Sequence, residues 1–292
     1  MSPSPTRRAL LLAALSTPLL GAWAKPKADA ATDAQRRLTQ LEADSGARIG
    51  VYAIDTAGTR RIAHRGGERF PMCSTFKVLV AATVLKRPDA AEFLQRRIAY
   101  GAADIVPNSP ITQQHVGAGM TAAELCAATI QYSDNAAANV LMRELGGPAA
   151  ITAFARSIGD DTFRLDRWET ELNSAIPGDE RDTTSPQAMA NTLQRLVLGD
   201  ALPASGRDQL KAWLLGNTTG GKRIRAGLPA DWQVGDKTGA GSYGTVNDVA
   251  VIWPPGRAPI VLAVYVTQRK QDAESRSDLV AAAAKVVADA WA

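Results

Sequence analysis

The sequence predicts an α/β (α+β) protein in which both chain ends build one antiparallel sheet flanked by helices, with an all-helical lobe inserted between them. Three observations predict this fold: strand patterns lie before residue 66, helical patterns run from about 74 to 216, and strand patterns return after residue 231. We therefore expect one lobe of residues 25–66 and 217–292 and an all-helical lobe of residues 67–216. The functional site should lie in the cleft between the lobes.

The first strand pair is predicted to be a hairpin. Apolar residues alternate with small or polar ones from Ile49 to Ile54, and a second β-rich run extends from Thr59 to about His64. Asp55 to Gly58 supply the turn residues between them. This hairpin would form one side of the sheet.

The central block carries start and stop signals typical of helices. Proline or glycine follows several of the apolar periodic stretches, and hydroxyl side chains precede others. The signals are Pro88, the capping box of Thr121 with Glu124, Gly146-Gly147-Pro148, and Ser185-Pro186 with Gly199 as the stop.

Strand patterns return near the C-terminus. Residues 232–238, 243–253 and 259–267 predict an antiparallel meander with a turn at Pro254-Pro255-Gly256. An alanine-rich helix over 274–291 closes the chain. The late strands would join the early hairpin in one sheet.

Composition excludes several classes of protein. The 292 residues are 46% hydrophobic and 21% charged, which excludes wholesale disorder and a multi-span membrane protein. A formal charge of +4 with no basic, aromatic-rich run argues against a nucleic-acid partner. Only two histidines, His64 and His115, and two cysteines, Cys73 and Cys126, occur, so no metal site is expected. A serine hydrolase here could use a histidine base only if one of those two serves.

Residues 1–24 are predicted to be an export signal. Arg7 and Arg8 provide a positive start, residues 9–20 are mainly apolar, and Ala22-Trp23-Ala24 has the small-x-small cleavage pattern. The twin arginine also fits the route for folded cargo, and an N-terminal membrane anchor is the alternative interpretation. We expect a periplasmic or secreted protein that does not associate with a membrane after the signal is removed.

Three short motifs occur in order along the chain. Ser74-Thr75-Phe76-Lys77 opens a helix and would place Ser74 and Lys77 on one face, Ser133-Asp134-Asn135 lies between helices, and Lys237-Thr238-Gly239 ends a strand. Each alone has an ordinary structural explanation, such as a helix N-cap for the first two. Together, in these structural contexts, they match the signature of class A β-lactamases and penicillin-binding proteins.

The chain closely resembles the class A serine β-lactamases over essentially the whole mature sequence. Residues 164–182 are similar to the family's Ω-loop, in which the residues matched by Glu169 and Asn173 hold the hydrolytic water. Arg167 and Asp182 match the ion pair at the base of that loop, although an ordinary surface pair is the alternative. Penicillin-binding proteins lack this loop.

The resemblance implies a role for each matched residue. It implies catalytic roles for Ser74, Lys77, Ser133 and Glu169, and an oxyanion hole made by the backbone N–H groups of Ser74 and Ala240. It implies substrate binding by Asn135, Asn173, Lys237, Thr238, Gly239, Ala240 and Arg223. Whether Lys77 or Glu169 takes the proton during acylation stays open.

The implied activity is hydrolysis of the β-lactam amide of penicillins and cephalosporins through a serine acyl-enzyme, which confers antibiotic resistance. The alternative is a penicillin-binding sensor or a D-Ala-D-Ala transpeptidase that acylates without turnover. The only partners expected are small β-lactam molecules, with no cofactor, no metal and a monomeric chain.

Three positions depart from the family pattern, and one short motif resembles the signature of an unrelated function. Some relatives bridge the residue matched by Cys73 to a cysteine where this chain has Gly241, and others bridge that matched by Cys126 to a cysteine where it has Ala81, so we expect two free thiols. Asn108 stands where many members place an aromatic residue at the cleft mouth. Residues 239–244 read G-x-G-x-x-G, but a strand pattern follows, which argues against dinucleotide binding.

Overall fold

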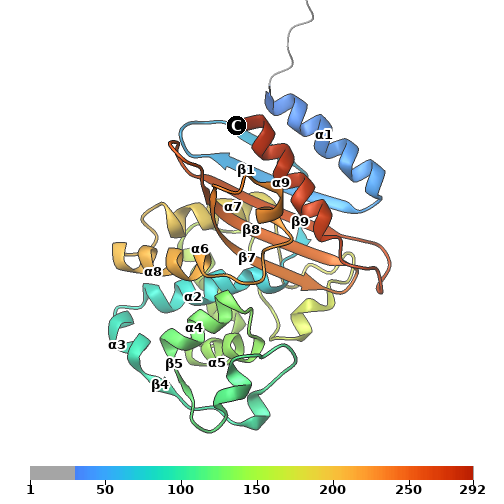
Figure 1. The fold of residues 1–292 in the computed structure, drawn as a ribbon. Helices are drawn as coiled ribbons and strands as arrows, with labels where there is room; N and C mark the ends of the chain where they lie inside the picture. The colour runs from blue at the N-terminus through green and yellow to red at the C-terminus, as the bar shows by residue number, and fades with distance from the viewer. Residues whose placement is uncertain (1–29, 292) are drawn as a thin grey trace, which may run out of the picture.

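A five-stranded antiparallel sheet joins the two ends of the chain in the computed structural model, which describes residues 30–291 (Figure 1). In spatial order its strands are β2 (Arg61–His64), β1 (Arg48–Asp55), β9 (Ile260–Thr267), β8 (Thr245–Trp253) and β7 (Gln233–Gly241). Val51 on β1 lies opposite both His64 and Val264. The predicted hairpin and meander are therefore confirmed, and β1 paired with β9 unites them.

Both faces of this sheet are buried. Every residue of β9 except Thr267 is buried, which explains why its sequence is a continuous apolar run rather than an alternating one. Along β8, Val249 and Val251 pack into one hydrophobic cluster while Ala250 and Ile252 pack into the other. Helices must therefore cover each face.

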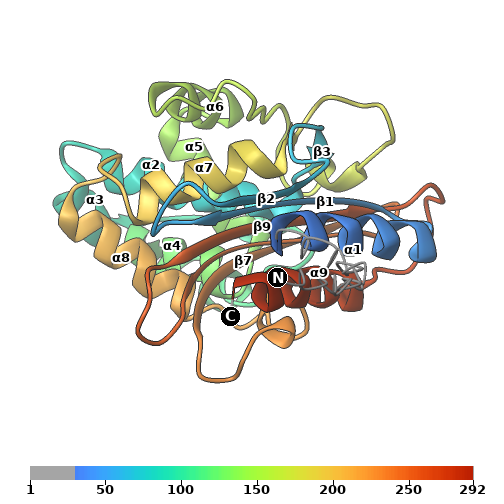
Figure 2. The same ribbon diagram turned by 90° about the horizontal axis from the view of Figure 1, so that it is seen from above.

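Helices α1 (Ala30–Ser45) and α9 (Ser277–Trp291) lie side by side on one face of the sheet (Figure 2). Leu38 of α1 and Val280 of α9 belong to the same buried cluster, and Arg37 pairs with Asp289 across the two helices at 2.8 Å. The closing helix was predicted. Helix α1 was not, although Ala34, Leu38 and Leu41 have the spacing of an amphipathic helix.

The other face carries the inserted segment. Its helices are α2 (Lys77–Lys86), α3 (Ala90–Gln95), α4 (Ala122–Gln131), α5 (Asn135–Leu145), α6 (Pro148–Ser157), α7 (Pro186–Val197) and α8 (Ala204–Leu215). The predicted signals act as expected: the Thr121 hydroxyl accepts from the Glu124 N–H, and Gly146 ends α5 at φ 97°. The Ser185 hydroxyl accepts from the Ala188 N–H at the start of α7.

The segment predicted to be all-helical also contains irregular loops and four two-residue strands. β3 (Phe70–Pro71) pairs with β6 (Thr183–Thr184), and β4 (Arg97–Ile98) pairs with β5 (Met120–Thr121). Strands of two residues have no sequence periodicity, so the pattern could not show them. The first of these pairs matters for the site, because it joins the chain just before Ser74 to the end of the Ω-loop.

The N-terminal prediction lies outside the described residues. Residues 1–24, where the export signal is expected, are not among them. Within residues 30–291, no helix combines the length and the apolar composition required to cross a bilayer.

Substitution of Gly50 tests the packing between the sheet and the inserted segment. A Cβ at this position would lie 2.5 Å from Cε2 of Phe70 and 2.8 Å from Cγ of Pro186, whereas one at Gly58 meets no atom within 4 Å. We expect Gly50→Ala to lower the free energy of unfolding by about 1–3 kcal/mol through overpacking. The control Gly58→Ala should change it by less than about 0.5 kcal/mol. Urea denaturation measures both, and equal effects would contradict this account of the packing.

Candidate active site

Ser74 lies in a one-turn 3₁₀ helix, η1 (Cys73–Phe76), directly before α2. The sequence predicted that Ser74 would open the α-helix itself. The difference arises because Cys73 enters the turn at φ 44°, and 3₁₀ turns are common where α-helices begin. One backbone and one side-chain hydrogen bond hold the turn: Met72 N–H donates to the Asp182 carbonyl at 3.0 Å, and Asn247 Nδ2 donates to the Pro71 carbonyl at 2.8 Å.

Lys77 is fully buried at the start of α2. Its Nζ donates to the Ser133 carbonyl at 2.7 Å and to Asn135 Oδ1 at 2.5 Å, and it lies 3.0 Å from Glu169 Oε1. Burial lowers the pKa of Lys77, and the Glu169 carboxylate acts in the opposite direction. The ammonium therefore gives up a proton more readily than an exposed lysine.

The loop of Ser133, Asp134 and Asn135 serves both as a helix cap and as part of the candidate site. Asp134 caps α5, since its Oδ1 accepts from the Ala137 N–H at 2.9 Å. Ser133 has φ 56°, a left-handed conformation that turns the chain between the helices. From the sequence, a helix cap and a functional role were alternative explanations of this motif. In the structure Asp134 caps the helix, while Ser133 and Asn135 contact Lys77.

Glu169 of the Ω-loop contacts three of the residues that the sequence singled out. Its Oε1 accepts from Ser74 Oγ at 3.1 Å and lies beside Lys77, while its Oε2 accepts from Asn173 Nδ2 at 2.5 Å. The whole residue Glu169 is 4% exposed to solvent. Asn139 on α5 clamps the backbone of Glu169, donating to its carbonyl at 2.8 Å and accepting from its N–H at 3.0 Å.

Asp182 holds the base of the Ω-loop from a buried position. Its Oδ1 accepts from the N–H groups of Asp166 and Arg167, and its Oδ2 accepts from Arg167 Nε at 2.6 Å. The Asp182 side chain is 1% exposed, so this is not the ordinary surface pair that was the alternative. A carboxylate with three donors fixes both ends of the loop.

The Lys237-Thr238-Gly239 segment lies along β7, the edge of the sheet. Lys237 Nζ donates to Ser133 Oγ at 3.0 Å. Burial lowers the pKa of Lys237 well below its ordinary value, and the charges of Lys77 and Arg223 act in the same direction. A Cβ on Gly239 would lie only 3.2 Å from the Ser74 nitrogen, so glycine lets the edge strand approach the 3₁₀ turn.

The remaining predicted residues lie at the end of β7 or behind it. Ala240 is exposed one residue beyond Gly239. The Asn173 carbonyl accepts from the Ser242 N–H at 3.0 Å, which ties the Ω-loop to the end of β7. Arg223 donates to the carbonyls of Gly239 at 2.9 Å and Asn247 at 2.7 Å, so its guanidinium is anchored on the backbone of β7 and β8.

Three asparagines around the site were not assigned these contacts from the sequence. Asn139 follows Asn135 by one helical turn, and that spacing is the only signal for it. Asn247 joins β8 to the segment before Ser74. Asn108 has φ 62°, and its Nδ2 donates to the Ser133 carbonyl at 3.2 Å, so its side chain is engaged with the loop rather than free at the cleft mouth.

Comparison with known proteins identifies the family. A family model described as "Beta-lactamase enzyme family" matches residues 33–291. The chain belongs to this family. It is 57% identical over 291 residues to "Beta-lactamase OXY-2" of Klebsiella oxytoca, covering 99% of each chain. It is 55% identical to "Carbapenem-hydrolyzing beta-lactamase KPC" of Klebsiella oxytoca, covering 96% of this chain and 95% of that one.

Solved structures place the chain among the class A serine β-lactamases. A variant of the last common ancestor of Gram-negative class A β-lactamases is 59% identical, with a TM-score of 0.86 and coverage of 89% of this chain and 98% of that one. A β-lactamase from Desulfarculus baarsii is 56% identical with the same TM-score, covering 89% and 97%. The predicted fold and family are therefore confirmed.

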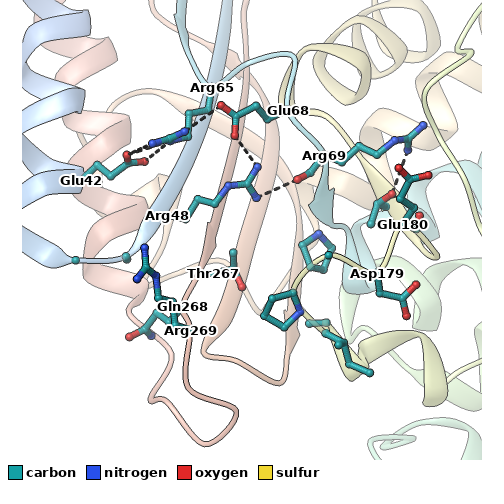
Figure 3. A pocket seen from close by; sticks show the side chains of 18 of the residues that line it. Glu42, Arg48, Arg65, Glu68, Arg69, Asp179, Glu180, Thr267, Gln268 and Arg269 are labelled. Carbon is teal, nitrogen blue, oxygen red and sulfur yellow. Dashed lines mark hydrogen bonds and ion pairs between the residues drawn. The ribbon is translucent and has the colours of Figure 1, made fainter.

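A cavity of about 900 Å³ lies elsewhere in this β-lactamase, between residues 175–180 of the Ω-loop, the start of β1 and the end of β9 (Figure 3). None of the predicted site residues lines it. Two of its arginines are neutralised, because Arg48 pairs with Glu68 at 2.7 Å and Arg65 pairs with Glu42 at 2.7 Å. The cavity is thus distinct from the cluster around Ser74.

The two cysteines are free and buried, as expected from the sequence. Burial raises the pKa of both thiols, so the reactive thiolate is scarce at neutral pH. We expect Ellman's reagent to modify neither Cys73 nor Cys126 in the native protein and to modify both after unfolding without reductant. Unfolded, unreduced protein with no reactive thiol would contradict the free state.

Proposed function

We propose that this protein hydrolyses the β-lactam amide bond of penicillins and cephalosporins through an acyl-enzyme on Ser74, and so confers antibiotic resistance. The observation that carries the proposal is the position of Glu169, whose Oε1 accepts from Ser74 Oγ at 3.1 Å while Asn173 holds its other oxygen. A carboxylate in this position can activate a water against an ester on Ser74.

Acylation begins with attack of Ser74 Oγ on the lactam carbonyl. Glu169 Oε1 accepts from Ser74 Oγ at 3.1 Å, so the carboxylate can receive the proton directly, whereas Lys77 Nζ beside it can do so only in its neutral form. The backbone N–H groups of Ser74 and Ala240 would stabilise the oxyanion, each contributing about 3 kcal/mol by comparison with similar enzymes.

Departure of the ring nitrogen requires a proton. Ser133 is suited to deliver it, because its hydroxyl accepts from Lys237 Nζ at 3.0 Å and lies 3.4 Å from Lys77 Nζ. Two ammonium groups on one hydroxyl favour release of its proton to the leaving nitrogen. Ser133 would then regain a proton from Lys77.

Substrate binding is assigned to the residues around this cluster. Lys237, Thr238 and Arg223 would attract the carboxylate beside the lactam nitrogen, with Gly239 allowing close approach of the β7 backbone. Asn135 would bind the side-chain amide of the substrate. Asn173 would help to orient the hydrolytic water, and the Arg167–Asp182 pair would keep the Ω-loop in place.

The alternative function is a penicillin-binding sensor or transpeptidase that acylates and does not turn over. Incubation with a chromogenic cephalosporin distinguishes the two functions. Many turnovers per protein support the hydrolase, and a burst equal to the protein concentration supports the sensor. We further propose that the protein is periplasmic or secreted and acts as a monomer on small β-lactams.

Replacement of Glu169 tests the deacylation step. We expect Glu169→Ala to slow deacylation by about 10²- to 10⁴-fold, because the general base is lost, while acylation stays measurable. Intact-protein mass spectrometry should then reveal a covalent penicillin adduct at steady state. Glu171→Ala, an exposed carboxylate of the same loop, is the matched control and should accumulate none. The absence of an adduct in Glu169→Ala would contradict the role of Glu169 as the general base of deacylation.

A further inference from the structure

Two fully buried carboxyl groups lie behind the Lys237-Thr238-Gly239 strand, and the proposed mechanism uses neither. Asp236 on β7 and Asp248 on β8 are both 0% exposed. The register places Thr238 opposite Asp248 and Asp236 opposite Ala250, so all four residues share one face of the sheet. Asp236 and Asp248 are therefore diagonal neighbours, and their carboxyl groups are close enough for a side-chain hydrogen bond between them.

Asp236 has the hydrogen-bond partners of an ionised carboxylate. Its Oδ1 accepts from Arg225 Nε at 2.6 Å, and its Oδ2 accepts from Asn217 Nδ2 at 2.6 Å. A Cβ on Gly220 would lie 2.0 Å from Asp236 Oδ2, so only glycine leaves room for the carboxylate there. Both oxygens of Asp236 thus accept from a strong donor, which is the pairing typical of a carboxylate.

Asp248 has a different environment. Its Oδ2 accepts only from the Ile224 N–H at 3.1 Å, and among the described residues no donor reaches its buried Oδ1. Burial and the neighbouring Asp236 raise the pKa of Asp248 well above its ordinary value, whereas Arg223 acts in the opposite direction. A buried carboxylate oxygen without a donor, next to a second carboxylate, is costly unless it carries a proton.

We propose that Asp248 is a neutral carboxylic acid that donates its proton to Asp236, and that this pair positions the carboxylate-binding end of the site. The proposal deepens the proposed function and rests on it for the identity of the ligand, a substrate carboxylate. Asp236 and Asp248 are positioning residues, since neither touches the reacting atoms.

A chain of hydrogen bonds carries the effect to Thr238. Because Asn217 Nδ2 donates to Asp236, Asn217 Oδ1 faces Thr219. The Thr219 hydroxyl donates to Asn217 Oδ1 at 2.8 Å. Thr219 Oγ1 lies 2.5 Å from Thr238 Oγ1 and is left to accept from it. The ionised Asp236 thereby fixes the amide orientation and, through it, the Thr238 hydroxyl.

The charges around the pair favour a single negative charge. Arg225 neutralises Asp236 directly, and Arg223 lies near Asp248 but gives its hydrogen bonds to the Gly239 and Asn247 carbonyls. Lys237, on the opposite face of β7, is a further cation close to both carboxyl groups. A second anion at Asp248 would draw Arg223 away from the β7 carbonyl and out of position for the substrate.

Two asparagine substitutions test the pair. Asp248→Asn keeps the shape of a neutral acid and can still donate to Asp236, so we expect kcat/KM for a cephalosporin to fall only about two- to threefold. Asp236→Asn replaces one of the two acceptor oxygens with an NH₂ group, so one of the two donors loses its partner. We expect kcat/KM to fall about ten- to hundredfold, mainly through KM. Equal losses, or a larger loss in Asp248→Asn, would overturn the proposal.

The pH dependence of stability gives a readout that needs no turnover. The folded-state pKa of Asp248 is raised, so the folded protein binds the extra proton and its stability falls as pH rises above 3.8, the ordinary value. Relative to Asp248→Asn, the folding equilibrium constant of the wild type should fall by up to about tenfold per pH unit in this window. A constant difference between the two proteins would overturn the proposal.

Infrared spectroscopy of protein with isotope-labelled aspartate detects the proton itself. We expect a protonated carboxyl band at neutral pH that disappears in Asp248→Asn and persists in Asp278→Asn, an exposed control paired with Arg276. Absence of the band in the wild type would overturn the proposal. A wild type that shows the band but does not hydrolyse β-lactams would instead remove the proposed function and leave the proton assignment standing.

Discussion

The ammonium of Lys77 and the carboxylate of Glu169 lie 3.0 Å apart with no side-chain exposure to solvent. Removing two such charges from water costs several kcal/mol for each ion, and their mutual attraction offsets this only if further hydrogen bonds complete both groups. Those bonds come from separate parts of the chain: Ser74 before α2, Ser133 and Asn135 before and in α5, and Asn173 in the Ω-loop. The site and the fold are thus mutually dependent.

The segments that complete this pair are themselves fixed by buried polar contacts rather than by regular structure. Asp182 closes the Ω-loop with three donors, Asn139 clamps the backbone at Glu169, and Asn247 holds the chain before Ser74. Neutral and charged hydrogen bonds of this kind contribute about 0.5–3 kcal/mol each, but leaving one unmade in the interior costs as much again. Such contacts specify one loop geometry more strictly than apolar packing can.

The edge strand β7 connects the two sides of the molecule. Lys237 reaches Ser133 from one face, and Asp236 and Thr238 join the Asn217–Thr219 network on the other. Because side chains alternate along a strand, three consecutive residues serve two separate polar clusters. A shift of one residue in the β7–β8 register would exchange the two sets, so the sheet register is also a requirement of the site.

Much of the fold and of the site could be predicted from the sequence. Turn residues and apolar runs located β1, β2 and the β7–β9 meander, caps such as Thr121 and Gly146 bounded the helices, and three ordered motifs indicated the residues that meet around Ser74. Local chemistry determines these features, and so they can be read without coordinates. Helix α1 was missed because its apolar positions are few, and the two-residue strands have no pattern to detect.

Only the tertiary structure decided which polar groups are buried together and which of their atoms meet. The sequence left Arg167 with Asp182 as a loop pair or a surface pair, and it said nothing of the shared environment of Asp236 and Asp248. Burial depends on packing between segments far apart in the chain, and burial sets both the strength of a hydrogen bond and the protonation of a carboxyl group. Residue types and their order therefore determined the class of chemistry, and the packing of distant segments determined how each group is charged and held.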